Sequence, residues 1–440
     1  MKSLKTTVIV LSALLSVGAN GFGMGIEVVN NDKLNLVIGG RIQLAGYGEY
    51  VSDPARSDGR VYLFLKQARL NLHGQVEGVK YNTEWVGAAE DVNGSNNGLT
   101  LLDFSFDVPV YKTSSTWLKV GQFKVPYGRE SLTDEGQFQF VEHSIDFNAF
   151  NLGRDYGAAV HTYKDKFAAV GGVFTGGSRD VPLRFLPERL GVPMLVARVG
   201  YNDGLDKDIF TVAQNDLHPN RTTKAAYVNG MYMRDTEIGH STVLGSRTSE
   251  KSWLINGNWN PFITRGAPVA GTPATKSHLS LGDFVQAGWD AAARGPLSGD
   301  MAWNAEAEMD YGRFSNGYGT IDLEGMRVQG GLIKKNIEVA LRYSVVLPDQ
   351  HFNNGGIPLT GEKPIHEVAP AVTYYMRGHD IKIVADFPVL INVPVFVEKN
   401  IGTYVSTEQP DQATVVNPAT KGYAERQTVP QARLMFQLAF

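Results

Sequence analysis

The chain has 440 residues, of which 43% are hydrophobic and 20% charged, and its formal net charge is −4. This balance is too polar for a bundle of membrane-spanning helices and too apolar for a disordered chain. Cysteine is absent, which excludes a disulfide framework, a thiolate metal site and a cysteine nucleophile. The 48 glycines and 21 phenylalanines are typical of a protein with many turns and many aromatic contacts.

The first 21 residues have the pattern of a secretory signal peptide. Lys2 and Lys5 precede an apolar run, 6–15, which is too short to cross a membrane, and small residues follow it. We expect cleavage near 19–24 and a mature chain of one domain, 22–440. Beyond this run no uninterrupted apolar stretch has the length of a transmembrane helix, so any membrane crossing is expected to use strands.

Apolar and polar residues alternate along most of the remaining chain. Ile42 and Leu44 share one face of a predicted strand, and Arg41 and Gln43 share the other. Similar alternation recurs at 64–73, 102–108, 195–201, 303–311, 337–345, 372–376 and 381–387. Lys66 interrupts one apolar row, and we expect it either to snorkel or to mark a register shift.

The polar face repeatedly carries charges at mid-strand, where a β-sandwich core would carry Val and Leu. One face is apolar and the other charged, which predicts a transmembrane antiparallel β-barrel around a wet lumen. If 205–249 is one connection, 16 strands result, which is our prediction; if 208–213 and 225–233 each span, there are 18. A secreted soluble β-protein that binds polysaccharide is the alternative.

The last eight residues form the predicted closing strand. Leu434, Leu438 and Phe440 fall on an uncharged face, and Arg433 falls on the other face. Ending on a large aromatic suits a strand that pairs with the first one and places a ring at the membrane interface. We expect the barrel assembly machinery to recognise this strand.

Several motifs follow one another in a distinctive order along 35–440. They are Gly40-Arg41-Ile42-Gln43, Gln67-Ala68-Arg69-Leu70, Thr373-Tyr374-Tyr375 and above all the block 117–133, which contains Gly121-Gln122-Phe123-Lys124-Val125-Pro126 and leads into 150–158. In this order the motifs resemble the phosphate-selective porin O/P family of Gram-negative outer membranes.

The resemblance implies a 16-stranded, trimeric porin whose third loop, 127–152, folds inward and narrows the channel. It also implies arginines and lysines that pass phosphate through the constriction. The candidate pore-lining residues are Arg41, Arg69, Lys124, Arg129, Glu130, Asp134, Glu135, Arg198, Glu306, Glu308, Arg327, Arg342, Arg377 and Arg433.

The third loop carries one cation, Arg129, against five carboxylates. Rows of Arg facing rows of carboxylates would give a transverse field that orients small polar solutes without a strong anion preference. We therefore expect passive diffusion of small hydrophilic solutes and ions, inorganic anions among them. Any single Arg could instead pair with a carboxylate on a neighbouring strand.

Signals for other functions are weak, and we expect no enzyme activity, cofactor, metal or nucleic-acid partner. The adjacent pair His143 and Ser144 is the one trace of a barrel-borne hydrolase, and neighbours on a strand point apart. Asp91-Val92-Asn93-Gly94 could hold a hard cation but is better interpreted as a turn. No phosphate-cradling loop or nucleophile elbow occurs.

Overall fold

The computed structural model describes residues 25–31, 33–51, 58–87, 99–111, 115–176, 192–212, 216–237, 281–316, 319–352, 364–395 and 425–440. The expected signal peptide and the turn at 91–94 lie outside these residues. None of the helices in this part of the chain is long and apolar enough to cross a membrane.

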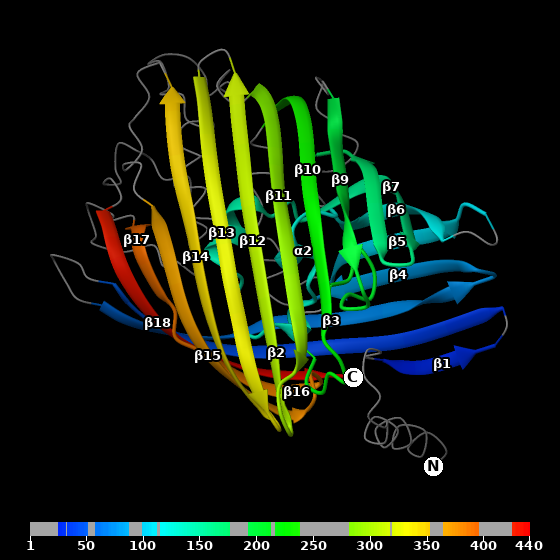
Figure 1. The fold of residues 1–440 in the computed structure, drawn as a ribbon, viewed down its shortest axis with the longest axis horizontal. Coiled ribbons are helices and arrows are strands. Elements are labelled where there is room, and N and C mark those ends of the chain that lie inside the picture. Colours follow the sequence, from blue (N-terminus) through cyan, green and yellow to red (C-terminus); the bar gives the residue numbers. More distant parts are fainter. Residues whose placement is uncertain are drawn as a thin grey trace.

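The described strands form a closed antiparallel barrel with sixteen wall positions (Figure 1). Strands β2 to β15 supply fourteen positions, β16 and β17 together supply the next, and β18 pairs with β2 to close the wall. The strands are β1 (Ile26–Asn30), β2 (Leu34–Val51), β3 (Asp58–Val76), β4 (Val79–Val86), β5 (Thr100–Pro109), β6 (Thr116–Lys124), β7 (Arg154–Lys164), β8 (Phe167–Phe174), β9 (Val192–Asn202), β10 (Thr223–Glu237), β11 (Leu281–Pro296), β12 (Met301–Asn316), β13 (Gly319–Lys334), β14 (Ile337–Phe352), β15 (Ile365–Arg377), β16 (Ile381–Asp386), β17 (Val389–Val395) and β18 (Glu425–Ala439). The prediction of 16 strands is confirmed.

The two short strands share a wall position because a proline interrupts the ladder. Both β16 and β17 pair with β15 on one side and β18 on the other. Pro388 lies between them and has no N–H to donate, although its carbonyl accepts from the Gln431 N–H at 2.8 Å.

The C-terminal strand β18 and the short strand β1 both pair with the same edge of β2. The Phe440 N–H and carbonyl exchange hydrogen bonds with Gly40 at 3.0 and 2.9 Å, so pairing runs to the last residue. Strand β1 continues along that edge, with Ile26 opposite Ile38. A Cβ at Gly40 would lie 2.6 Å from the Phe440 ring, so glycine leaves room for this aromatic.

The alternation of faces is as predicted for most strands. Ile42, Leu44 and Leu434 are exposed on the outer wall, whereas Arg41 and Arg433 are buried on the inner side. A wall that is apolar outside and charged inside suits lipid on one face and water on the other.

Lys66 marks a register shift, one of the two outcomes expected for it. Gln43 pairs with Gln67, but Leu44 pairs with Leu65, so Lys66 is an extra residue in the ladder. Its ammonium forms a buried ion pair with Glu142. Beyond this bulge the faces are exchanged: Phe64, grouped with the apolar row from sequence, instead packs edge-on against the inward Tyr47.

The segment 205–249 is not one long connection. Thr223–Glu237 is strand β10, and 203–222 joins it to β9. The β9–β10 connection lies at the end of the barrel where most other connections are short, including the turns after β3, β7, β13 and β15. The C-terminus lies at the same end, because the Ala439 N–H donates to the Asp380 carbonyl in the β15–β16 turn at 2.7 Å. Short turns characterise the periplasmic end of an outer-membrane barrel.

The β6–β7 connection, residues 125–153, is held against inward-facing side chains of the wall. It contains α2 (Arg129–Leu132), the 3₁₀ turn η1 (Glu135–Gln137) and α3 (Ile145–Phe150). Glu308 on β12 accepts the N–H groups of Arg129 and Glu130 at 2.7 and 3.1 Å, which satisfies the first donors of α2. On other strands Asp386 accepts from the Val141 N–H at 2.8 Å, and Glu367 from that of Ile145 at 3.0 Å.

The β9–β10 connection reaches the same place from the opposite end of the barrel. Arg129 donates to both carboxylate oxygens of Asp206, at 3.0 and 2.7 Å, and neither side chain has exposed area. Thr133 and Val212 form a parallel bridge between the two connections.

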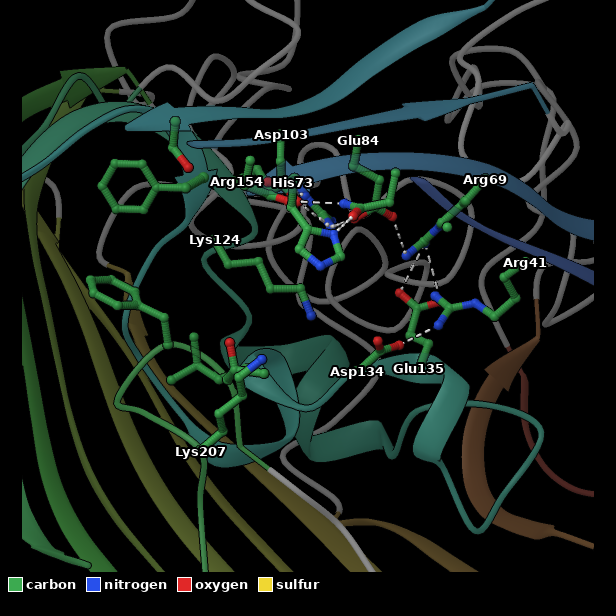
Figure 2. Close-up of a pocket in the computed structure, with 18 of the residues that line it drawn as sticks. Arg41, Arg69, His73, Glu84, Asp103, Lys124, Asp134, Glu135, Arg154 and Lys207 are labelled. Atoms are coloured by element: carbon green, nitrogen blue, oxygen red, sulfur yellow. Dashed lines mark hydrogen bonds and ion pairs between the residues drawn. The ribbon is translucent and has the colours of Figure 1, made fainter. Parts of the chain in front are cut away.

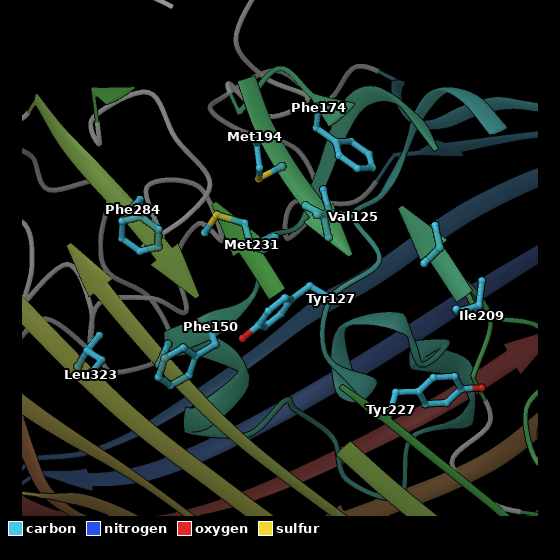
Figure 3. Packing of buried hydrophobic residues seen from close by; sticks show 14 of the residues in the cluster. Val125, Tyr127, Phe150, Phe174, Met194, Ile209, Tyr227, Met231, Phe284 and Leu323 are labelled. Atoms are coloured by element: carbon cyan, nitrogen blue, oxygen red, sulfur yellow. The ribbon is translucent and has the colours of Figure 1, made fainter. Parts of the chain in front are cut away.

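Apolar side chains from both connections pack in one cluster with the wall, chiefly with strands β6 to β11 and also with β13, β14, β15, β17 and β18. Figure 3 shows Val125, Tyr127 and Phe150 of the first connection near Met231 and Phe284 of the wall. The second connection contributes Leu205 and Ile209, which are buried in the same cluster. The two connections therefore share a hydrophobic core with the barrel wall.

One carboxyl in this core has an oxygen without a hydrogen-bond partner. Asp146 in α3 is buried, and its Oδ1 has no hydrogen-bond partner within the described residues. Burial, together with the nearby carboxylates of Asp310 and Glu308, raises the pKa of Asp146 well above its usual value. Its ionised form therefore opposes packing of α3 against the wall.

We expect Asp206→Ala to release the β9–β10 connection. Removing one partner of a buried ion pair costs about 3–5 kcal/mol because Arg129 loses its bidentate acceptor. Trypsin should then cleave after Lys207 at least about tenfold faster, as the local opening free energy falls. Asp216→Ala in the same connection is the control, and unchanged cleavage in Asp206→Ala would contradict the prediction.

We expect Asp146→Asn to stabilise the barrel increasingly as the pH rises. A carboxyl with a raised folded-state pKa favours the folded state fully below its unfolded pKa of about 4 and loses that contribution as the pH rises through the folded value. The gain in Tm over wild type, followed by circular dichroism in detergent, should therefore be small at pH 4 and larger at pH 8. Asp300→Asn in the exposed β11–β12 turn should show no such trend; a gain that shrinks with pH would count against this account.

Candidate functional site

A pocket of about 380 Å³ lies on the side of the lumen that the two connections leave open (Figure 2). Strands β2 to β7 form one wall of it, and residues 132–137 and 207–211 form the other. Its charged lining residues are Arg41, Arg69, Lys119, Lys124, Arg154 and Lys207, with Glu84, Asp103, Asp134 and Glu135. Six cationic groups and four carboxylates line the pocket, which leaves two positive charges in excess.

The strand side of the pocket is a chain of alternating charges. The Arg69 guanidinium lies 3.2 Å from both Glu84 and Glu135. Arg154 in turn lies 3.9 Å from Glu84 and donates to Asp103 at 2.9 Å. Each arginine is thus held between carboxylates, and the guanidinium planes are fixed along the wall.

Two lysines of the pocket are not part of this chain of ion pairs. The Lys124 ammonium donates to the carbonyl of Thr133 at 3.0 Å, and Figure 2 shows Lys207 across the pocket from the arginine chain. Neither lysine has an ion pair with a carboxylate of the described residues. Their charges are therefore the uncompensated ones in the pocket.

The acidic residues of η1 are neutralised by the wall. Asp134 forms an ion pair with Arg41. Burial alone would raise the pKa of Asp134, but the Arg41 guanidinium outweighs it, and the pKa lies well below the usual value. In the same way Arg69 overcomes burial and holds the pKa of Glu135 well below its usual range. Both carboxylates stay ionised, and arginines on β2 and β3 neutralise their charge.

Five of the fourteen residues expected from sequence line this pocket, and seven others lie in a buried network on the opposite wall. The five are Arg41, Arg69, Lys124, Asp134 and Glu135. The seven are Arg129, Glu130, Arg198, Glu306, Glu308, Arg327 and Arg342, all at most 4% exposed.

The seven residues of the buried network pair with each other and with nearby carboxylates. Arg327 lies 3.2 Å from Glu130, 3.1 Å from Glu306 and 2.9 Å from Glu308. Arg198 and Arg129 share Asp290, at 2.5 and 3.2 Å. These arginines and carboxylates are therefore in direct contact and do not face each other across open water. This is the arrangement expected if an arginine pairs with a carboxylate on a neighbouring strand.

The remaining two expected residues lie away from the pocket. Arg377 is at the end of β15, 39% exposed in its side chain, and pairs with Asp380 in the adjoining turn at 3.4 Å. Arg433 is buried on β18, 4.0 Å from Asp386 and over the Tyr47 ring.

The His143–Ser144 pair has structural contacts. The His143 ring stacks on Phe147 at 3.7 Å between centroids. Ser144 donates to Glu130 at 2.5 Å and accepts the Phe147 N–H at 3.1 Å, as the N-cap of α3. No group of three or more His, Asp or Glu suited to a metal ion occurs within the described ranges.

Sequence reasoning missed Lys207, Arg154 and Asp206 as residues of the lumen. Arg154 lies in the block 150–158 but carries no feature that separates it from the other arginines. For the connection 203–222 a signal did exist, since Leu205, Ile209 and Val212 recur at intervals of four and three, as residues that pack on one surface do.

Comparison with known proteins agrees with this geometry. Residues 38–185, which run from β2 past the end of β8, match the family model described as phosphate-selective porin O and P. No curated protein matches the chain significantly.

Among solved structures, a loop L8 deletion mutant of OmpT, an outer membrane protein of Vibrio cholerae, superimposes with a TM-score of 0.51 at 10% identity, over 93% of this chain and 100% of that one. The trimer form of in-vitro folded OmpT from the same organism gives 0.50 at 10% identity, with the same coverage. These likenesses establish the porin barrel fold, and with it the soluble alternative is wrong. From the matched segment and the closed, outwardly apolar barrel, the chain is an outer-membrane porin, and its residues 38–185 are similar to the phosphate-selective porin O and P family.

Proposed function

We propose that this porin passes small hydrophilic solutes by passive diffusion along the β2–β7 side of its lumen. The observation that carries the proposal is the pocket of about 380 Å³ between those strands and the two connections. On the opposite side, ion pairs without exposed area, such as those of Asp206 with Arg129 and of Asp290 with Arg198, are closed to a solute, which favours the β2–β7 side as its path.

In this proposal the two connections together form the constriction. The third loop, 127–152, contributes Asp134 and Glu135 to the pocket, and the β9–β10 connection contributes Lys207 and Phe210. The loop therefore narrows the channel from the side of the long connections, while the second segment narrows it from the side of the short turns.

We also propose a moderate preference for anions, inorganic phosphate among them. The loop carboxylates, which from sequence would oppose such a preference, are paired with wall cations. Lys124 and Lys207 keep their charge available to a solute, and a cation in a confined pore attracts counter-ions strongly.

The proposed activity needs no chemistry and no cofactor. His143 and Ser144, the pair that could suggest hydrolysis, are engaged in stacking and in capping α3, which supports a non-enzymatic role. A nucleophile also needs a base within hydrogen-bond reach, and the Ser144 hydroxyl donates to Glu130 inside the packed loop.

We also propose that the protein forms a homotrimer and that the barrel assembly machinery recognises β18. The trimer form of OmpT supports a homotrimer, since the two barrels share their fold. The ordered pairing of Phe440 with Gly40 and the exposed row of Leu434, Phe436 and Leu438 support recognition of β18 by the barrel assembly machinery. Lipid contacts the same row in the finished barrel.

Replacing the free lysines should shift ion selectivity toward cations. The test is the zero-current potential of single channels in a planar bilayer under a salt gradient. Wild type should favour the anion, and Lys207→Glu combined with Lys124→Gln should reverse the sign, because the lining changes from two excess cations to one excess anion. Lys334→Glu, at the exposed end of β13, is the control for a charge change outside the pocket.

A cation preference in wild type would overturn the proposed selectivity. The absence of conductance steps in wild type would overturn the channel itself.

Deleting 131–148 should raise single-channel conductance without unfolding the barrel. The deletion removes η1 and most of α3 from the lumen, and water can then solvate the arginines that lose their partners. Retention of the heat-resistant folded form in gel electrophoresis checks the barrel. Unchanged conductance in a folded variant would remove the loop from the constriction.

A further inference from the structure

A groove runs over the lipid-facing surface of β8 to β11, outside the lumen. It has a volume of about 740 Å³, within the roughly 300–1,000 Å³ of ligand sites. Phe167, Tyr201 and Trp289 border it, and each of these rings is exposed on the outer wall. Ala226 forms the floor, where its cross-strand neighbours are Tyr201 and Ala291. The hollow exists because small residues replace large ones at the centre of an aromatic border.

Lysines stand at the short-turn end of this groove. Lys166 lies in the β7–β8 turn with its ammonium 5.7 Å from the centre of the Tyr201 ring. Lys224, at the start of β10, approaches the same ring at 6.0 Å. Lys164 adds a third ammonium to the groove lining. Neither Lys166 nor Lys224 forms an ion pair with a carboxylate in the described part of the chain.

The local carboxylates do not cancel this charge. Asp165 is exposed in the same turn, and Asp203 accepts the backbone N–H of Lys224 at 2.7 Å. Three ammonium groups against two carboxylates leave a positive rim next to an almost wholly apolar floor. That combination is complementary to an anionic lipid, whose headgroup would meet the positive rim and whose acyl chain would lie along the apolar wall.

We propose that this groove binds one anionic phospholipid of the periplasmic leaflet. Its phosphate would lie between Lys166 and Lys224 above the edge of Tyr201, and an acyl chain would follow Ala226 toward Val228 and Trp289. The short turns place the rim at the periplasmic end of the barrel, where the headgroups of that leaflet lie. Basic side chains at a membrane surface attract anionic headgroups, and aromatic rings anchor at the same depth.

A second copy of the chain fits the groove less well. In the heterologous interface of a homotrimer, the rim would meet a different patch of the next copy, and that patch would have to be anionic to match the lysines. A lipid phosphate supplies the opposite charge that the rim lacks. The proposal therefore commits to lipid and concerns a surface separate from the conducting pocket.

Native mass spectrometry of the delipidated protein in detergent tests this, with phosphatidylglycerol and phosphatidylcholine as separate probes. Wild type should retain phosphatidylglycerol about tenfold more strongly than phosphatidylcholine, as expected for two lysines at a membrane surface. The variant Lys166→Gln/Lys224→Gln should lose this difference. Ala226→Trp, which fills the floor and keeps the lysines, should lower retention of both lipids.

The matched control is Lys334→Gln/Lys335→Gln, which removes two exposed lysines from the β13–β14 hairpin at the same end of the barrel. Equal retention of the two lipids by wild type, or an equal loss in the control, would overturn the proposal. So would an Ala226→Trp variant that changes the oligomeric mass while keeping its lipid, since the groove would then be a subunit contact. Single-channel conductance should be unchanged in all three variants, so failure here would leave the proposed channel unaffected.

Discussion

The fully buried guanidinium of Arg129 organises the inside of this barrel. It binds Asp206 of the other connection and Asp290 of the wall, at 2.7 and 3.2 Å. An unpaired charge without solvent contact would be strongly destabilising, so the three elements must come together for Arg129 to be buried at all. Once they do, the carbon chains that carry these charges exclude water, and the apolar cluster can close around them.

This interaction makes the lumen unequal on its two sides. On the β10–β14 side, arginines meet carboxylates in contact, as Arg327 does with Glu306 and Glu308. On the β2–β7 side, the arginine chain has the same chemistry but borders open volume. Planar guanidinium groups suit fixed, bidentate pairing, whereas an ammonium on a flexible stem stays available to a passing solute. In the pocket, the arginines therefore serve the structure, and in the proposed channel Lys124 and Lys207 are the cations left for a solute.

The alternation of apolar and polar residues with a period of two predicts most strands of the barrel from the sequence, because one face of each strand must meet lipid and the other must not. Even the register shift at Lys66 could be expected, since a charge in an apolar row demands a local change. The contacts inside the barrel could not be predicted in this way. Arg129 and Asp206 lie 77 positions apart, and no local pattern indicates that they meet. The spacing of Leu205, Ile209 and Val212 could have indicated packing of the second connection, but a helix-like period in a segment between strands does not say which surface it contacts. For the same reason the acidity of the third loop argued against a strong anion preference, whereas the cations that neutralise the loop lie on strands distant in sequence.

The pairing of the loop with the wall also limits how the channel can vary. Asp134 and Glu135 both narrow the pocket and neutralise Arg41 and Arg69, so a change at either residue alters width and field together. Lys207 belongs to neither chain of ion pairs, and it is placed by a connection whose anchor, Asp206, is the adjacent residue. Substitution at Lys207 can therefore change the electrostatic potential of the passage while the packing that sets its width remains. In the proposed channel, selectivity would therefore change through the β9–β10 connection, and the width of the passage through the third loop.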